Sequence, residues 1–137
     1  MEIWPSGHMS PIHDHGEAFA VIKVLEGKIN ASYFTNLGKH RIKLEPDVML
    51  EKGNATWLGP DNYQIHQLHN DFDRVCVTIQ CYQYANEDTG HDEYFEYIEA
   101  KTGAKKPFYP TSDWEFVSFK KQIKAEWEQH LKDKEWK

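Results

Sequence analysis

The sequence predicts a mainly β protein, an antiparallel sandwich or barrel followed by one C-terminal amphipathic helix. Short β-rich runs alternate with turns containing glycine or proline up to about residue 85. The segment from Ser112 onward contains neither glycine nor proline and repeats apolar residues every three to four positions. The length of 137 residues fits a single domain with a core of its own.

The expected strands follow one another along the chain, and turn residues close each of them. "FAVIKVLEGK" ends at Gly27, and "KINASYFTNLGK" ends at Gly38. The run "HRIKLEPDVMLEKGNA" is interrupted at Pro46 and again at Gly53. "TWLGPDNYQIHQLHN" contains a strong turn at residues 59–62. "RVCVTIQCYQY" is the strongest strand, because it is dense in β-branched and aromatic residues.

The C-terminal segment predicts a helix with one apolar face. Ser112 and Asp113 are suited to cap its N-terminus. The apolar stripe consists of Phe116, Phe119, Ile123, Trp127 and Leu131. We therefore expect a barrel over residues 1–111 and a helix over residues 112–137, packed on the barrel or, alternatively, on a partner such as a second copy of the chain.

Composition excludes several classes of protein. The formal net charge of −6 argues against a nucleic-acid-binding surface. The sequence shows no secretory signal and no apolar run near the ~20 residues that cross a bilayer. Cys76 and Cys81 would point to opposite faces of one strand, so they should not form a disulfide. We expect a cytoplasmic protein with no nucleic acid or membrane partner.

Eight histidines are many for this length, and two of them are suitably spaced for a metal site. On a strand, His13 and His15 project from the same face while Asp14 points away. Neutral imidazole binds Fe, Zn, Cu and Ni alike, so the spacing does not name the metal. A lone pair of this kind is also common as a structural or surface feature, and the pattern alone leaves both interpretations open.

The residues around this pair resemble the first cupin motif. Five residues separate Gly7 from His13, and Gly27 takes the place of the closing glycine. The position that usually carries the acidic metal ligand is Ala20, so the frame is kept while the carboxylate is missing. The resemblance implies a single small jelly-roll barrel.

A second stretch is similar to the end of the second cupin motif. There, His66 is followed four residues later by Asn70, after the turn at residues 59–62. The resemblance implies a metal site of three neutral imidazoles, from His13, His15 and His66. On an expected strand, His69 should face away from this site, because it is three residues beyond His66. If a turn lies there instead, His69 could compete with His66 for the metal.

A three-histidine cupin site points to one family in particular. "WPSGHMSPIHDH" followed by "VIKVLEGK" resembles the cysteine dioxygenase family, as do "IHQLHN" and, more loosely, "AKTGAKKPF". The resemblance runs from about residue 3 to about residue 109. It implies an Fe(II) cofactor held by the three histidines, with open positions for a thiolate, a second substrate group and O2. The implied product is a sulfinic acid.

Two departures from the family concern the residues beside the metal. Ala20 also replaces the cysteine that cross-links to a tyrosine in animal members, so Tyr82 cannot form that cross-link. The family's Ser-x-His-x-Tyr relay reads Thr78, Gln80 and Tyr82 here, three side chains on one face of a strand. We expect these three as the catalytic residues. Since glutamine does not titrate, any acid–base part of the relay is weakened at Gln80.

A further departure concerns substrate binding. The family's arginine for the substrate carboxylate lies upstream of its tryptophan, in a region outside this sequence, and neither Arg41 nor Arg74 matches it. Bidentate capture of a carboxylate favours a guanidinium group. Either the chain is the catalytic part of something longer, or its substrate is not held as cysteine is.

The leading functional prediction is an enzyme that oxidises a small, cysteine-like thiol to its sulfinic acid with O2. Two alternatives remain open: a three-histidine cupin dioxygenase acting on a non-thiol molecule such as a diketone, and a catalytically inactive cupin that binds a small molecule. The C-terminal helix is the surface expected to join copies if the chain forms a homo-oligomer. The acid-rich run at residues 86–99 is expected to be a solvated segment.

Overall fold

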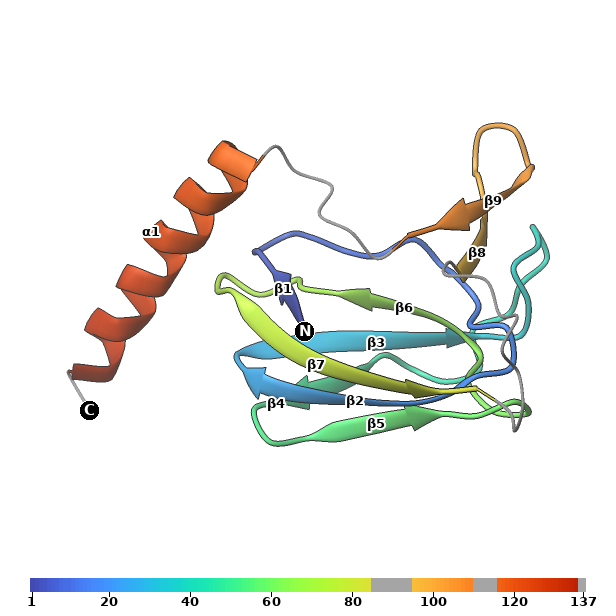
Figure 1. Cartoon of the computed structure of the whole chain (residues 1–137), viewed down its shortest axis with the longest axis horizontal. Helices are drawn as coiled ribbons and strands as arrows, with labels where there is room; N and C mark the ends of the chain where they lie inside the picture. Colours follow the sequence, from blue (N-terminus) through green and yellow to red (C-terminus); the bar gives the residue numbers. More distant parts are fainter. Residues whose placement is uncertain (85–94, 110–115, 136–137) are drawn as a thin grey trace.

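A computed structural model describes residues 1–84, 95–109 and 116–135 (Figure 1). The strands and the helix of these residues are β1 (Glu2–Trp4), β2 (Phe19–Glu26), β3 (Lys28–Phe34), β4 (Val48–Glu51), β5 (Ala55–Leu58), β6 (Ile65–His69), β7 (Cys76–Gln83), β8 (Phe95–Ile98), β9 (Lys105–Phe108) and α1 (Phe116–Glu135). The expected fold class, mainly β with a C-terminal helix, is confirmed.

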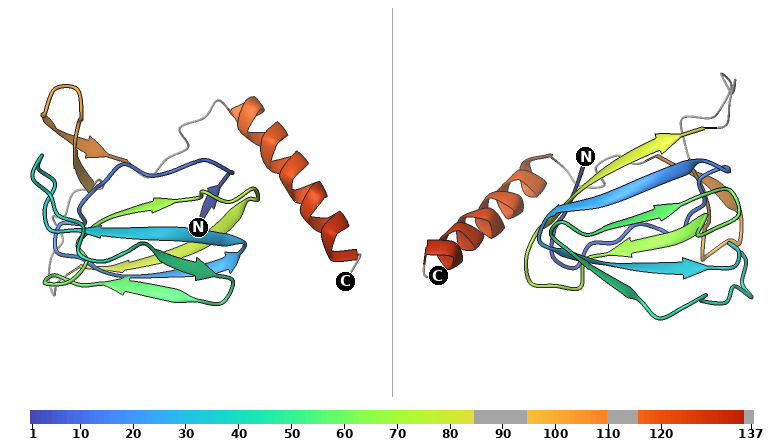
Figure 2. Two further views of the ribbon diagram at one scale, coloured as in Figure 1. Left: turned by 180° about the vertical axis from the view of Figure 1, so that it is seen from behind. Right: turned by 90° about the horizontal axis from the view of Figure 1, so that it is seen from below.

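The strands form two antiparallel sheets and a separate hairpin. One sheet has the order β1-β7-β2-β5 and the other β4-β3-β6, while β8 pairs only with β9 within these sheets (Figures 1 and 2). Side chains alternate between buried and exposed along β2, so this strand turns one face inward. The core lies between the sheets and consists of Ile22, Val24, Ile29, Ala31, Tyr33, Leu50, Leu68 and Cys76. This is the cupin arrangement that the motifs implied.

The expected strands agree with the structure except in the third run. In that run, residues 40–45 do not form a strand, and β4 begins only at Val48. The turn at residues 59–62 is closed by two backbone hydrogen bonds between Gly59 and Asn62, each 2.9 Å long. Both cysteines are free thiols, as expected. The proposed helix caps lie at residues 112–113, outside the described residues.

Helix α1 lies at the end of the barrel that is remote from the β8–β9 hairpin (Figures 1 and 2). Two polar contacts join it to the barrel: Asp133 lies 2.6 Å from the guanidinium of Arg74, and His130 Nε2 lies 3.3 Å from a carboxylate oxygen of Glu26. Trp127 and Leu131 remain 40% and 45% exposed. The division into a barrel over 1–111 and a helix over 112–137 stays a prediction. Within the described ranges, no helix is long and apolar enough to span a membrane.

Gly27 makes the tight connection between β2 and β3. Its φ of 76° lies in the left-handed region, and a Cβ at this position would meet the carbonyl oxygen of Val75 at 2.4 Å. That contact is with backbone, so it cannot be relieved by turning a side chain. Glycine is therefore required at this corner for two separate reasons.

Replacing Gly27 with alanine should destabilise the fold more than the same change at Gly7. Gly7 has a φ of 77° but nothing within 4 Å of its would-be Cβ, so Gly7→Ala carries only the conformational penalty of about 1 kcal/mol. Gly27→Ala adds the backbone clash, for a total loss of roughly 3 kcal/mol in the free energy of unfolding. Urea unfolding of both variants measures the difference. Equal losses would contradict the close approach to Val75.

Candidate metal centre

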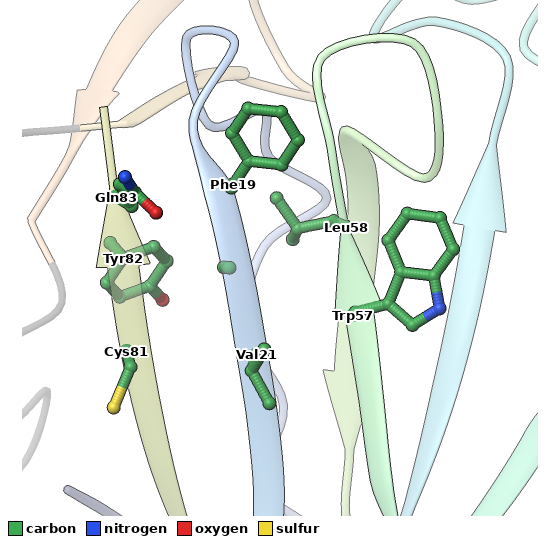
Figure 3. A pocket seen from close by; sticks show the side chains of 8 residues that line it. Phe19, Val21, Trp57, Leu58, Cys81, Tyr82 and Gln83 are labelled. Atoms are coloured by element: carbon green, nitrogen blue, oxygen red, sulfur yellow. The ribbon is translucent and has the colours of Figure 1, made fainter. Parts of the chain in front are cut away.

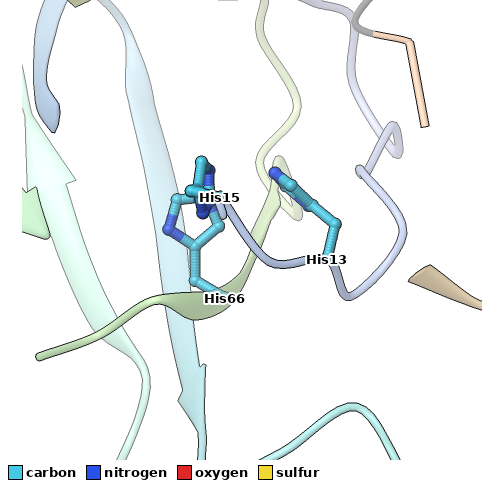
Figure 4. A group of neighbouring side chains, drawn as sticks. All are labelled: His13, His15 and His66. Carbon is cyan, nitrogen blue, oxygen red and sulfur yellow. The ribbon is translucent and has the colours of Figure 1, made fainter. Parts of the chain in front are cut away.

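Three histidine side chains meet inside the barrel (Figure 4). The ring centroids of His13 and His15 are 4.7 Å apart, those of His13 and His66 4.9 Å, and those of His15 and His66 4.5 Å. One nitrogen from each ring lies within 4.8 Å of the other two. All three residues are buried, with at most 4% of their surface exposed. The structure thus brings together the three histidines that the motifs singled out.

Backbone pairing places two of these rings side by side. The N–H of His13 donates to the carbonyl of His66, and the N–H of His66 donates back to the carbonyl of His13, both at 3.1 Å. In an antiparallel pair, residues bonded in this way project their side chains to the same face. His15 follows two residues later and completes the group.

Hydrogen bonds to the backbone fix the orientation of two rings. His13 Nδ1 lies 2.9 Å from the carbonyl oxygen of Pro11, and His15 Nδ1 lies 2.8 Å from that of Gln64. A carbonyl only accepts, so each Nδ1 carries the proton and each Nε2 presents a lone pair. This is the usual arrangement of a metal-ligating histidine, in which the second ring nitrogen is anchored to a carbonyl.

Burial keeps the three rings neutral. Loss of solvent lowers the pKa of His13 to about 3, with a smaller contribution from neighbouring His15, and lowers the pKa of His15 to about 4. Burial also lowers the pKa of His66 well below its ordinary value. The metal-binding form of imidazole is the neutral one, so the site needs no deprotonation at neutral pH.

The donor set fits a transition metal ion. The Nε2 atoms of His15 and His66 are buried and have no hydrogen-bond partner, although an unpaired buried polar atom costs about 1–3 kcal/mol. A metal ion would satisfy both lone pairs. Among the residues that the structure describes, no carboxylate or thiol joins the group. Ala20, at the position of the missing acid, is buried on β2 opposite Tyr82.

His69 lies outside this group. Its Nε2 is 3.1 Å from the hydroxyl of Ser32, and its Nδ1 is 2.6 Å from a carboxylate oxygen of Asp71. Because side chains alternate along β6, the ring of His69 lies on the opposite face of the strand from Leu68. It is held by the buried Ser32 and the exposed Asp71 and does not belong to the group of three histidines.

A small cavity adjoins the histidines, and aromatic side chains fill most of it. Its free space is about 10 Å³, enough for about one water molecule. The ring of Phe95 lies 4.6 Å from that of His15, and the ring of Phe108 lies 4.7 Å from that of His13. These two phenylalanines occupy paired positions in the β8–β9 hairpin. The hairpin therefore covers the site.

A chain of hydrogen bonds runs from this cavity to the first strand. The hydroxyl of Tyr82 donates to the side-chain carbonyl of Gln80, and the amide nitrogen of Gln80 donates to the carboxylate of Glu2. Tyr82 also stacks on His15 at 5.9 Å between ring centroids. Thr78 does not line the cavity, and its hydroxyl accepts a 2.9 Å hydrogen bond from the indole of Trp4. Whether Tyr82, Gln80 and Thr78 act in catalysis stays a prediction.

Three residues of the site were not expected from the sequence: Glu2, Phe95 and Phe108. The interpretation of residues 86–99 as a solvated segment is wrong at Phe95, which is 7% exposed and packs on the histidines. The acidic neighbours of Phe95 concealed it, because a single aromatic residue among charges gives no periodic signal. Glu2 carried a usable signal: it precedes Trp4 by two residues, so both share a face of β1.

A larger hollow lies on the outer face of the β7-β2-β5 sheet (Figure 3). It measures about 340 Å³, and Phe19, Val21 and Trp57 line it with about half of their surface exposed. Among the described residues, its lining has neither a histidine nor a carboxylate. Chemistry rather than size therefore identifies the candidate site as the buried histidine cluster.

Removing any one of the three ligands should abolish tight metal binding. We expect His13→Ala, His15→Ala and His66→Ala to lose bound Fe(II), and His69→Ala to keep it, because His69 faces other partners. Metal analysis of anaerobically loaded protein measures the content. The rise in Tm on metal addition gives a second readout, since an ion that binds only the folded state stabilises it. Retention of metal by His66→Ala would exclude His66 as a ligand.

The carboxyl of Glu2 should make stability depend on pH. Burial raises the pKa of Glu2 from 4.5 to about 7, against the opposing effect of the amino terminus. Between these values the folded state keeps a proton on Glu2 that the unfolded chain has lost, so the contribution of Glu2 to stability falls by at most about 3 kcal/mol as pH rises through about 4.5 to 7. The three buried histidines, whose pKa values are lowered, act in the opposite direction over this range, so the effect of Glu2 is read as a difference between variants.

Urea unfolding of the metal-free protein at both ends of this range measures the effect. Glu2→Gln keeps the histidines but lacks this carboxyl, so its stability relative to the wild type should increase by up to about 3 kcal/mol between pH 4.5 and 7. Glu51→Gln is the matched control, because Glu51 is exposed on β4 beside Lys28, and it should behave as the wild type does. The same pH dependence in Glu2→Gln and wild type would contradict the burial of this carboxyl.

The chain resembles several solved structures at low identity. It is 16% identical to the TT1209 protein of Thermus thermophilus (TM-score 0.43), covering 58% of this chain and 65% of that one. It is 15% identical to an oxalate oxidase (TM-score 0.46), covering 58% of this chain and 38% of that one. It is 16% identical to a cupin-superfamily sugar phosphate isomerase from Silicibacter pomeroyi (TM-score 0.47), covering 81% of this chain and 69% of that one. The chain thus spans less than two thirds of the first two structures.

No curated protein sequence matches the chain. Its residues 1–88 do match the sequence pattern of cysteine dioxygenase type I. The matched segment contains all three histidines of the cluster, and the two findings together fit a metal-binding dioxygenase of the cupin fold. Since the match extends over 88 of the 137 residues, the protein belongs to the cysteine dioxygenase type I family.

Proposed function

We propose that this protein is an Fe(II)-dependent thiol dioxygenase that converts a small thiol to its sulfinic acid. The observation that carries the proposal is the donor set: three buried, neutral imidazoles with two orphaned Nε2 atoms and no carboxylate, in a chain of the cysteine dioxygenase type I family. An Fe(II) ion held by His13, His15 and His66 would supply the one-electron chemistry that O2 needs to react with a thiolate.

The overall reaction is R–SH + O2 → R–SO2H. Two sulfur–oxygen bonds form and the bond of O2 breaks. The sulfur is oxidised by four electrons, and the two oxygen atoms take up those four electrons. The thiol proton ends on the sulfinic acid, so no further oxidant or reductant is needed.

The ligand set suits an anionic sulfur. Neutral imidazoles from His13, His15 and His66 do not offset the charge of a metal ion, as a carboxylate at Ala20 would. A site of this charge favours the thiolate form of the substrate over the thiol. Retention of three neutral ligands is therefore consistent with a substrate that brings its own negative charge.

The remaining residues of the cavity can orient the substrate and exclude water. Phe95, Phe108 and Leu68 give the cavity apolar walls. The hydroxyl of Tyr82 offers the site a hydrogen-bonding group, and burial raises the pKa of Tyr82, so it stays a neutral phenol. Gln80 holds that hydroxyl by its carbonyl. Because an amide does not titrate, Gln80 would position Tyr82 rather than carry a proton.

Substrate access would require the β8–β9 hairpin to move. The free space beside the histidines holds about one water molecule, less than any thiol occupies. Displacement of Phe95 and Phe108 would open the cavity. Such closure over a bound substrate is a common way to exclude water from a reacting centre.

Oxygen consumption tests the proposal. Fe(II)-loaded protein is mixed with a panel of small thiols and with non-thiol molecules such as diketones, and oxygen uptake is followed with an electrode. We expect uptake with a thiol, and a product that carries two labelled oxygen atoms when the gas is ¹⁸O2. Tyr82→Phe should retain iron and lose roughly 10- to 100-fold in turnover, because the hydroxyl that orients the reactants is gone.

His66→Ala and His69→Ala provide the controls. The first should lose both iron and uptake, and the second should keep both. Uptake only with a non-thiol substrate would replace the thiol assignment. Full iron loading without uptake on any compound would identify a binding module instead of an enzyme.

A further inference from the structure

The cavity beside the histidines is lined by an acidic side chain, that of Glu2. Among the residues that the structure describes, its lining contains no second carboxyl group and no lysine or arginine. Apart from the histidines, the other described lining residues are aromatic, apolar or neutral polar. A carboxylate in this position would repel a second carboxylate. A substrate such as cysteine, which carries one, would find no cation here.

Both arginines and the two lysines of strand β9 already have other partners among the described residues. Arg74 lies 2.6 Å from Asp133, and Arg41 lies over the ring of Phe34 at 5.9 Å. In the hairpin that covers the site, Lys105 pairs with Glu96 and Lys106 with Glu99. The sequence of residues 85–94 and 110–115 contains four and two acidic residues, respectively, and neither lysine nor arginine.

On the basis of the proposed function, we propose that the substrate is a small cationic aminothiol, whose ammonium group pairs with the carboxylate of Glu2 while its sulfur faces the three histidines. Glu2 would then determine specificity: it selects an amine as the second polar group of the substrate and rejects a carboxylate.

The surroundings of Glu2 suit this role. Gln80 donates a hydrogen bond to one oxygen of the carboxylate and thereby fixes the group, and a carboxylate accepts further hydrogen bonds. Trp4 and Tyr82 line the same cavity, and aromatic rings attract ammonium groups. Burial raises the pKa of Glu2 although the positive charge of the amino terminus acts against it, so that charge does not offset the burial of the carboxyl. An ammonium group in the cavity would supply a closer cationic partner.

Two thiols of similar size test the inference. 2-Aminoethanethiol carries an ammonium group, whereas 3-mercaptopropionate carries a carboxylate. Binding of each to the Fe(II)-loaded protein is measured by calorimetry without oxygen, so that affinity is read independently of turnover. Oxygen uptake is then measured separately. We expect the aminothiol to bind about 10- to 100-fold more tightly, the range for a charge pair that is removed from water.

Substitutions at Glu2 test whether this residue causes the tighter binding of the aminothiol. Glu2→Gln keeps the shape of the side chain and removes its charge, so the preference for the aminothiol should disappear. Glu2→Asp keeps the charge and should restore part of it. Glu51→Gln removes an exposed carboxylate of β4 and should leave the preference unchanged. If the Glu2 variants do not fold, the wild-type comparison still decides the substrate class.

The outcomes separate this inference from the proposed function. Equal binding, tighter binding of 3-mercaptopropionate, or a preference that survives in Glu2→Gln would overturn the role of Glu2, while oxidation of any thiol would leave the dioxygenase proposal standing. Tight binding of the aminothiol without oxygen uptake on any thiol would support the Glu2 pairing and reject the dioxygenase. Absence of thiol binding to the metal-loaded protein would reject both.

Discussion

The site depends on the pairing of the N-terminal segment with β6. Residues 7–13 run alongside this strand, held by backbone hydrogen bonds from Gly7 to Asn70, from Ser10 to Leu68 and between His13 and His66. Side chains alternate along such a pair, so a shift of one residue would turn His13 away from the interior. The register of this short ladder therefore decides whether a metal site exists. The buried Asn70 holds the end of this pairing at Gly7, because the side-chain amide of Asn70 donates to the carbonyls of Trp4 and Arg74.

The interior of the barrel has an apolar half, which is stabilised by burial alone, and a polar half, whose groups need partners when they are buried. Toward α1 it is an ordinary apolar core, in which Ile22, Val24 and Ile29 pack between the sheets. Toward the hairpin it holds imidazoles, an amide, a phenol and a carboxyl, each of which costs free energy when it is buried without a partner. Hydrogen bonds satisfy most of these groups, and a bound ion would satisfy the rest. The stability of this half of the fold is consequently tied to what it binds.

The sequence predicted the metal ligands better than it predicted the pocket. Spacing suggested the pair His13 and His15, and the resemblance to the two cupin motifs favoured a metal site and added His66, because these signals are local. Phe108 and Glu2 belong to the site only through contacts between distant segments: Phe108 pairs with Phe95 across a hairpin, and Glu2 pairs with Thr78 between β1 and β7. The spacing from Trp4 gives the face of β1 on which Glu2 lies, but no local pattern encodes which strand lies beside it.

The same limit applies to the relay. Thr78, Gln80 and Tyr82 lie on one strand, and alternation placed them on one face. It could not show that Thr78 would pair with Trp4, leaving Gln80 to bridge Tyr82 and Glu2. Partner choice among polar side chains depends on which strand lies alongside, and here that strand is β1.

The N-terminal segment also contacts the hairpin that covers the site. His13 forms a bridge to Tyr97 in β8, and the N–H of Asp14 donates to the carbonyl of Glu96 at 2.9 Å. The segment that carries His13 is thus bonded on one side to β6 and on the other to β8 of the hairpin. Displacement of the β8–β9 hairpin would strain the hydrogen bonds on either side of His13. Opening of the hairpin would therefore also disturb the segment that positions the imidazole of His13, so the entry of a small molecule would be coupled to the arrangement of the three histidines.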